Sequence, residues 1–264
     1  MSKKPSLIQA GLARGLDLTP SPYGECPVQT VYLKGLAMLI AGFSAGPWST
    51  NCWVVSPGAS QECVVIDPGY ESSDQISQII SENKLKPVAV LLTHGHIDHM
   101  WSVTPIADGY EIPAIIHAAD SSWLADPVSS LSEESQLLVQ TLGGKFQEPK
   151  VLQTFSQNQN MTIAGLNLDI LCAPGHTPGS VMFRFNDINQ SLLFSGDVLF
   201  QGSIGRTDLA GGDWSSMQDT LQNVVIPLPD DLAVLCGHGP QTTIGDEKQN
   251  NPYLQSFVGR KNYE

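Results

Sequence analysis

A compact cluster of metal-ligand residues stands directly after an apolar run, and it constrains the fold more than any other feature of the chain. The run covers residues 88–92 and is followed by Thr-His-Gly-His-Ile-Asp-His at 93–99. In extended backbone, residues two apart point to the same side, so His94 and His96 can hold one ion together, while Gly95 lets the backbone approach closely. Asp98 and His99 face elsewhere and can hold a second ion. Imidazole and carboxylate are ligands that zinc takes in catalytic sites, so a metal site at a strand end is predicted.

A histidine-rich surface loop is the alternative interpretation of this cluster. The chain contains only six histidines, and the chance that three of them take these positions is on the order of a few per thousand. The apolar run immediately before the cluster argues further against a surface loop. A metal site is therefore the favoured interpretation.

Three later residues of ligand type each follow an apolar, strand-like run. They are His176 in Cys-Ala-Pro-Gly-His-Thr-Pro-Gly at 172–179, Asp197 in Leu-Phe-Ser-Gly-Asp at 193–197, and His238 in Val-Leu-Cys-Gly-His-Gly-Pro at 234–240. A single histidine after a strand is more often structural than functional. Because the same context recurs three times alongside the first cluster, these residues are predicted to join it.

Short β-rich runs alternate with amphipathic stretches from residue 51 onward, which is typical of an α/β sandwich. The predicted strands are 52–55, 63–66, 88–92, 114–116, 168–171, 181–185, 192–194 and 233–235, and the predicted helices are 74–82, 133–141 and 214–224. The turns between these runs hold most of the histidines. The chemistry is therefore expected on loops at strand ends, where a rigid scaffold usually displays function.

The composition fits one globular domain. The chain has 264 residues, of which 41% are hydrophobic, enough to bury a substantial core. Residues 1–37 have mixed polar, glycine and proline content with little periodicity. We expect them to form a loosely structured N-terminal extension before a single domain at 38–264.

The charge and cysteine content exclude several classes of partner. Thirteen basic and 26 acidic residues give a net charge of −13, so no binding to nucleic acid or to anionic lipid is expected. The five cysteines are odd in number and form no Cys-x-x-Cys pair, which argues against a disulfide framework or a zinc finger. No apolar run is long enough to span a membrane, and a cytoplasmic location is expected.

The ordered set of motifs resembles the metallo-β-lactamase superfamily, with Asp67 in Ile-Asp-Pro-Gly at 66–69 matching its first short motif. The resemblance covers roughly residues 38–254. It implies an αββα sandwich, with two mixed sheets flanked by helices and the metals at one edge of the sheets. It also implies a ligand set: His94, His96 and His176 for the first metal, Asp98, His99 and His238 for the second, and Asp197 bridging the two.

Four other residues near these motifs are expected either to support the site or to be structural only. His117 matches no ligand position of the family and is expected to be structural. Asp67 is expected either to orient a ligand imidazole or to serve only as a turn residue at a strand end. Arg206 and Asp208 are expected to pair, either as a support for the site or as an ordinary surface pair.

Such a site predicts hydrolysis without a side-chain nucleophile. Two metals about 3.5 to 4 Å apart can share a water, lower its pKa toward neutrality and present it as hydroxide while polarising a carbonyl. The sequence has no Gly-x-Ser-x-Gly nucleophile motif, in agreement with this mechanism. Asp98 and Asp197 are the candidate catalytic carboxylates, and Asp197 is expected to help orient the hydroxide as well as bridge the metals.

Within the superfamily, the segment 196–209 is similar to that of glyoxalase II-type thioesterases. The chain also ends soon after His238, as shorter bacterial glyoxalase II-like proteins do. The resemblance therefore implies a thioester of a small hydroxy acid as substrate and two zinc ions per chain, with iron or manganese as possible substitutes. Persulfide dioxygenases share the Gly-Arg-Thr-Asp run at 205–208, so a mononuclear iron dioxygenase is the alternative, together with a lactonase. The Gly-His-Gly-Pro context at 237–240 favours the hydrolase.

Overall fold

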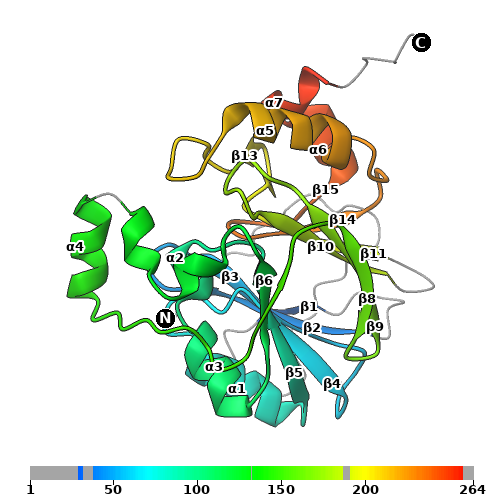
Figure 1. The fold of residues 1–264 in the computed structure, drawn as a ribbon. Coiled ribbons are helices and arrows are strands. Elements are labelled where there is room, and N and C mark those ends of the chain that lie inside the picture. Colours follow the sequence, from blue (N-terminus) through cyan, green and yellow to red (C-terminus); the bar gives the residue numbers. More distant parts are fainter. Residues whose placement is uncertain (1–28, 32–37, 132, 187–190, 258–264) are drawn as a thin grey trace, which may run out of the picture.

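Two β-sheets pack face to face, and helices cover their outer faces (Figure 1). The computed structural model describes residues 29–31, 38–131, 133–186 and 191–257. Its layers run helix, sheet, sheet, helix, and this arrangement confirms the predicted αββα sandwich with two mixed sheets. None of the helices in these described ranges has the length and apolarity needed to cross a membrane.

The first sheet has seven strands in sequence order. They are β1 (Gln29–Val31), β2 (Leu39–Ala45), β3 (Thr50–Ser56), β4 (Glu62–Ile66), β5 (Lys86–Leu91), β6 (Ala114–His117) and β7 (Leu152–Phe155). β1 to β4 pair antiparallel, whereas β4 to β7 pair parallel. Parallel neighbours need crossover connections. Helix α1 (Ser73–Glu82) connects β4 to β5, helices α2 (Ile97–Met100) and α3 (Val103–Tyr110) connect β5 to β6, and the segment that contains α4 (Glu133–Thr141) connects β6 to β7.

The second sheet has six strands, and only its β11–β14 pair is parallel. In spatial order they are β15 (Thr242–Thr243), β14 (Ala233–Cys236), β11 (Ser191–Gly196), β10 (Val181–Asn186), β9 (Leu166–Cys172) and β8 (Gln159–Ile163). A small hairpin follows β11, made of β12 (Leu199–Phe200) and β13 (Ser203–Ile204). The outer face is covered by α5 (Trp214–Thr220) with its π-helical continuation Leu221–Val225, by α6 (Ile244–Asn250) and by α7 (Pro252–Gln255).

The core lies on both faces of each sheet. In β3, Cys52 and Val54 face the helical layer, whereas Trp53 and Val55 face the second sheet. This period of two is the normal alternation of a strand. Because both faces are covered, β3 is apolar on both sides, as buried strands in layered α/β folds are. Between the sheets, the ring of Phe194 packs edge-on against Trp53 at 5.7 Å between centroids, and a change of Phe194 to alanine is expected to cost about 3 to 5 kcal/mol of stability.

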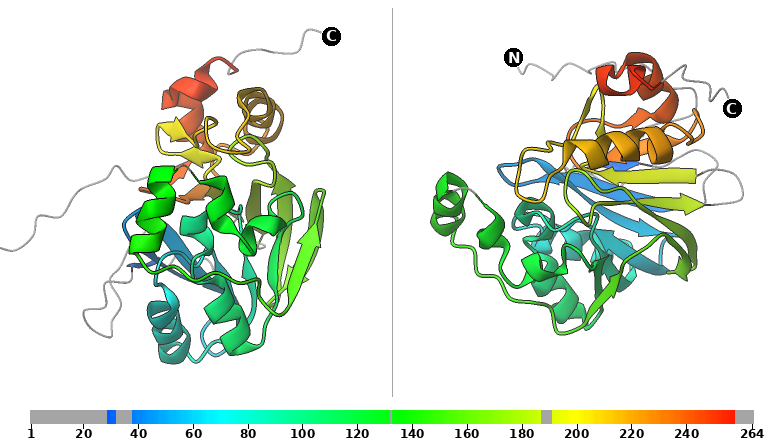
Figure 2. Two further views of the ribbon diagram at one scale, coloured as in Figure 1. Left: turned by 60° about the vertical axis from the view of Figure 1, so that its left-hand side comes forward. Right: turned by 45° about the horizontal axis from the view of Figure 1, so that its top comes forward.

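The predicted elements correspond to observed ones, with small shifts at their ends. The strand expected at 88–92 is β5, and the helix expected at 214–224 is α5 with its π-helical turn. The predicted helix 133–141 is α4 (Glu133–Thr141), which stands away from the sandwich (Figure 2). Several short elements were not predicted, among them β2, β7, β8, α6 and the 3-10 helices Ser121–Leu124 and Pro127–Ser130.

The N-terminal extension contributes a strand to the first sheet. Its residues 29–31 form β1, which pairs antiparallel with β2 at that edge of the sheet. The remainder of the predicted extension, residues 1–28 and 32–37, lies outside the described residues.

Candidate metal centre

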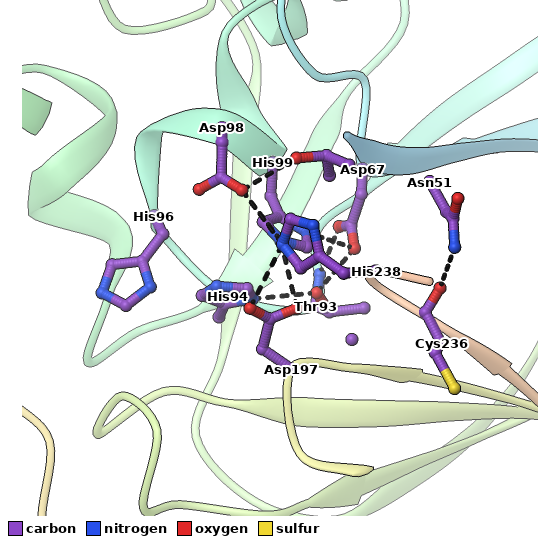
Figure 3. Close-up of polar contacts among 12 residues, drawn as sticks. Asn51, Asp67, Thr93, His94, His96, Asp98, His99, Asp197, Cys236 and His238 are labelled. Carbon is purple, nitrogen blue, oxygen red and sulfur yellow. Dashed lines mark hydrogen bonds and ion pairs between the residues drawn. The ribbon is translucent and has the colours of Figure 1, made fainter. Parts of the chain in front are cut away.

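The seven predicted ligands come together where the two sheets meet at one edge. Figure 3 labels six of them, all but His176. The first sheet supplies four of them from the loop after β5 and the start of α2, and the second sheet supplies one from each of three loops, after β9, β11 and β14. Three overlapping triads each offer ligand atoms within 4.8 Å of one another: His94, His96 and His176; His94, His99 and Asp197; Asp98, His99 and His238. All seven residues belong to at least one triad.

Backbone carbonyls fix the orientation of two imidazoles. The Nδ1 atom of His238 lies 3.0 Å from the carbonyl oxygen of Trp48, and Nδ1 of His176 lies 2.7 Å from the carbonyl oxygen of Arg206. Because a carbonyl oxygen only accepts hydrogen bonds, each Nδ1 must carry a proton. In a neutral ring, each Nε2 then presents its lone pair to the cluster.

A carboxylate and a hydroxyl orient two further imidazoles. His99 Nδ1 lies 2.9 Å from Oδ2 of the buried Asp67, which leaves Nε2 facing the cluster. The hydroxyl of Thr93 donates to the same Asp67 oxygen at 2.7 Å. That hydroxyl hydrogen is thereby used, so Thr93 Oγ1 accepts from His94 Nδ1 at 3.1 Å. Asp67 thus orients a candidate ligand imidazole, one of the two roles expected for it, as outer carboxylates do at metal sites.

His96 is oriented differently, with Nδ1 toward the cluster. That atom lies 2.8 Å from Nε2 of His176, which belongs to the same triad. The outer side of the ring stacks on Trp123, at 5.7 Å between centroids and 3° between planes. Packing against a flat aromatic face therefore takes the place of a hydrogen bond in holding this imidazole.

Two atoms of the cluster fit a metal better than they fit any protein partner. Among the described residues, His94 Nε2 and Asp197 Oδ1 are buried without a hydrogen-bond partner, although Asp197 Oδ1 lies 3.2 Å from His99 Nε2. An unsatisfied buried polar atom costs about 1 to 3 kcal/mol, so each such atom in a native protein needs an explanation. Here both atoms belong to a nitrogen and oxygen donor set that suits zinc, iron or manganese. The cluster thus fits a dinuclear metal site.

The electrostatic balance differs across the cluster. Burial holds the pKa of His94 well below its usual value and lowers that of His96 to about 3. Burial also disfavours the charged forms of His99 and His238, but the neighbouring carboxylates of Asp197 and Asp98 outweigh it. They raise the pKa of His99 well above its usual value and that of His238 to about 9.

The cluster opens to solvent on the side of His238 and Asp98. Their side chains are 26% and 15% exposed, whereas the His99 side chain is fully buried. Asp98 Oδ2 accepts a hydrogen bond from Thr50 Oγ1 at 2.8 Å. The Asn51 side chain ties the end of β3 to the His238 loop by donating to two carbonyl oxygens, those of Cys236 and Gly239, at 2.9 Å each. A reactant is therefore expected to approach past His238.

Two further predictions can be compared with this geometry. His117 belongs to none of the three triads; its Nδ1 accepts from the Ala119 amide, and its ring packs on Phe155, in keeping with the structural role expected for it. Arg206 and Asp208 do pair, through two hydrogen bonds of 2.9 and 2.7 Å, but both side chains are 67% exposed. They form a surface pair, and the contribution of Arg206 to the cluster comes from its backbone carbonyl.

Sequence reasoning missed several residues that support the candidate ligands. Among them are Trp48, Thr50, Asp120 and Trp123. A backbone carbonyl such as that of Trp48 can come from any residue type and leaves no signal in a sequence. Asp120 follows strand β6 in His-Ala-Ala-Asp at 117–120, and only its place after a strand could have drawn attention to it.

Similarity to known proteins agrees with this fold and donor set. A sequence profile of the metallo-beta-lactamase superfamily matches residues 45–238. The chain is 40% identical over 224 residues to an uncharacterised protein of Mycobacterium tuberculosis, covering 83% of this chain and 99% of that protein. It is 34% identical over 202 residues to hydroxyacylglutathione hydrolase GloC of Haemophilus influenzae, covering 74% of this chain and 89% of that protein.

Two solved structures are also similar. The BLEG-1 B3 metallo-β-lactamase is 38% identical with a TM-score of 0.70, over 81% of this chain and 99% of that chain. TTHA1623 in a di-iron-bound form is 32% identical with a TM-score of 0.64, over the same shares of the two chains. The profile match, these identities and the αββα architecture together establish that this chain belongs to the metallo-β-lactamase superfamily.

Proposed function

We propose that this protein is a two-metal hydrolase that cleaves thioesters of small hydroxy acids. The ligand assignment that we propose gives the first ion to His94, His96 and His176, the second to Asp98, His99 and His238, and Asp197 to both. The observation that carries it is the buried His94 Nε2, which has no hydrogen-bond partner, together with Asp197 Oδ1, which faces only His99 Nε2 at 3.2 Å, beside imidazoles whose other nitrogens are already bonded. Zinc is the proposed metal, with iron or manganese as substitutes.

The residues of the chain would orient and activate the reactants. Two bound ions supply a water that ionises near neutral pH and polarise the carbonyl that it attacks. Asp98 lies on the open side and is fixed by Thr50. Burial disfavours its charged form, but His99 and a hydrogen bond to His238 hold its pKa at about 2, so Asp98 stays a carboxylate that can accept a hydrogen bond from the attacking water. Asp197, between the two halves, would hold that water from the other side.

The thioester assignment is supported by the similarity to GloC, whose name describes it as a hydroxyacylglutathione hydrolase, and by the segment 196–209. The open side is bordered by the half-buried Trp48, whose carbonyl binds His238, and by Phe200, whose ring lies 6.0 Å from that of His238. The Phe200 ring offers an apolar surface to an acyl group. The nearby Arg206 side chain is already paired with Asp208, so we do not assign the thiol to glutathione.

The experiment offers four substrates to metal-loaded protein side by side. S-lactoylglutathione is followed by thiol release, glutathione persulfide by oxygen uptake, a lactone by ring opening, and a β-lactam by absorbance, because BLEG-1 is described as a β-lactamase. We expect thiol release from the thioester, loss of that activity in His94→Ala, and full activity in His117→Ala, a histidine outside the cluster. Oxygen uptake with one iron per chain and no thiol release would contradict the hydrolase and favour the dioxygenase.

We also propose that residues 38–264 form the catalytic domain and that residues 1–37 are not needed for catalysis. None of the seven candidate ligands lies before residue 94. Trp48, Thr50 and Asp67, which support them, also lie within the proposed domain.

A further inference from the structure

Asp120 is a fully buried carboxylate that touches none of the candidate ligands directly and that the proposed chemistry does not use. It lies just after β6, before the short 3-10 helix Ser121–Leu124. Its Oδ2 accepts hydrogen bonds from the amide of Gly95 at 2.9 Å and from the hydroxyl of Thr177 at 2.6 Å. Its Oδ1 accepts from the amide of Gly179 at 2.7 Å. A single side chain therefore receives three hydrogen bonds from two loops.

These two loops carry all three residues of one triad. Gly95 lies between His94 and His96, and Thr177 follows His176 directly. One loop leaves β5 of the first sheet, and the other joins β9 to β10 of the second sheet. The carboxylate of Asp120 thus connects the two sheets at the point where the His94, His96 and His176 triad is assembled.

The packing around Asp120 fixes how closely the loops approach it. A Cβ atom placed on Gly179 would lie 2.6 Å from Asp120 Cγ, and one placed on Gly95 would lie 3.0 Å from Asp120 Cβ. Glycine at both positions allows contacts that no other residue would permit. Trp123, three residues after Asp120, stacks on the His96 ring. The segment that follows β6 therefore holds the first triad through both a hydrogen-bonded and an aromatic contact.

The chemistry of the contact requires a carboxylate. Two of the donors are backbone N–H groups and the third is a hydroxyl, and an ionised carboxylate accepts from all three without offering a donor of its own. An amide of the same shape would offer one oxygen and place its NH2 group against a donor. Hydrogen bonds to an ionised acceptor are also stronger than neutral ones.

We infer that Asp120 is a positioning residue that sets the spacing between the His94–His96 pair and His176, and thereby the metal affinity of that half of the centre. The inference rests on the proposed metal assignment. It concerns a carboxylate that acts through the backbone of ligand loops, in contrast to Asp67, which contacts His99 directly.

The experiment compares wild-type protein with Asp120→Asn by chelator competition, using zinc and then cobalt. We expect the His94, His96 and His176 half of the variant to lose metal affinity by about 10- to 100-fold, the range for losing an outer contact that orients a ligand. Zinc content after dialysis should fall from two per chain toward one, and the visible spectrum of the cobalt protein should change. Thr177→Val, which removes one of the three donors, should shift affinity in the same direction by a smaller factor.

Glu247 offers a matched control. It is another buried carboxylate with three donors, the amide of Gly202, the hydroxyl of Thr242 and the side-chain amide of Asn251. None of these donors adjoins a candidate ligand in sequence. Glu247→Gln should therefore lower thermal stability while leaving both zinc affinities and the cobalt spectrum at wild-type values.

The outcomes separate this inference from the proposed function. If Asp120→Asn and Thr177→Val lower stability as Glu247→Gln does but keep both metal affinities and the cobalt spectrum, Asp120 is structural only and the inference is wrong. If Asp120→Asn does not fold, Thr177→Val is measured alone. Wild-type metal affinities in Thr177→Val would then show that the inference is wrong. Wild-type protein that binds two ions but hydrolyses no thioester would contradict the proposed function and leave the role of Asp120 standing.

Discussion

The two halves of the candidate centre are built on different electrostatic principles. The half made of His94, His96 and His176 contains only imidazoles and is closed to solvent, with each residue at most 8% exposed. The half made of Asp98, His99 and His238 contains a carboxylate and opens to solvent at Asp98 and His238. Burial lowers the pKa of His94 and His96, whereas carboxylates raise that of His99 and His238.

This difference suggests a division of labour between the halves. In the closed half, burial keeps His94 and His96 neutral, so they can bind a cation without first losing protons, whereas the open half must release protons before its ion can bind. Each half has an outer carboxylate, Asp120 for the closed half and Asp67 for the open half. Asp67 contacts His99 of the open half directly but reaches His94 of the closed half only through the Thr93 hydroxyl. Changing Asp197, which the halves share, should affect both metal sites at once. Changing a residue that supports one half should affect mainly the metal affinity of that half.

The largest effect is expected from Asp197→Ala, which removes the residue between the halves. Asp197 Oδ1 lies 3.2 Å from His99 Nε2, and Oδ2 lies 3.5 Å from His176 Nε2 and 3.4 Å from His238 Nε2. Both ions should lose more than about 100-fold in affinity, beyond the effect of an outer contact. Elemental analysis and metal titration measure this. Full occupancy of both sites in the variant would remove the bridging assignment.

The next effect is the dependence of metal binding on pH. Without metal, His238 has a pKa of about 9 and the pKa of His99 is raised well above its usual value, so this pair of imidazoles holds protons at pH 7 that it must release to bind an ion. The affinity of the open half should rise with pH up to about 9, by about tenfold per unit for each proton released. His94 and His96 should contribute no such rise near pH 7, because burial holds the pKa of His94 well below its usual value and that of His96 at about 3.

Zinc titration in weakly buffered solution with a pH indicator tests this prediction. Near pH 7, the ion that binds the open half should release protons, whereas the ion that binds the closed half should release few protons. Equal proton release for both ions would mean that the halves do not differ in protonation, and the electrostatic comparison would fail.

A smaller and more local effect is expected from Asp67→Asn. The side chain receives hydrogen bonds from the amide and hydroxyl of Thr93 and faces His99 Nδ1, so its loss should disturb the open half more than the closed half. We expect a fall of about 10- to 100-fold in one metal affinity. The cobalt spectrum should change differently from that of Asp120→Asn. Identical spectra and affinities in the two variants would show that the halves are not held independently.

The smallest effect is expected from removing residues 1–37. A chain that starts at Met38 keeps both halves and loses the β1–β2 pairing at the edge of the first sheet. Both metal affinities and the turnover rate should stay within about twofold of wild type, since surface changes away from a site usually have little effect. Circular dichroism and metal titration measure this. Loss of folded protein would show that the domain needs the extension to fold and that its description as loose is wrong.

Much of the centre was predictable because its chemistry depends on residue type and spacing. The run at 93–99 places four ligand-type residues after a buried strand, and the contexts of His176, Asp197 and His238 each repeat the same strand-end pattern. The sandwich followed from the alternation of β-rich and amphipathic runs. Strand β2 was not predicted, and its apolar residues are interrupted by Gly42 and Ser44.

The sequence by itself determined which residues can act as ligands, because only a few side chains have the donor atoms. Only the tertiary structure decided how His176 and His238 are oriented, since that depends on backbone atoms, which carry no residue signature. The carbonyls of Trp48 and Arg206 set the tautomers of His238 and His176, and any residue type would supply the same oxygen. The buried contacts of Asp120 likewise depend on two loops from different sheets, whose proximity is a property of the packed fold.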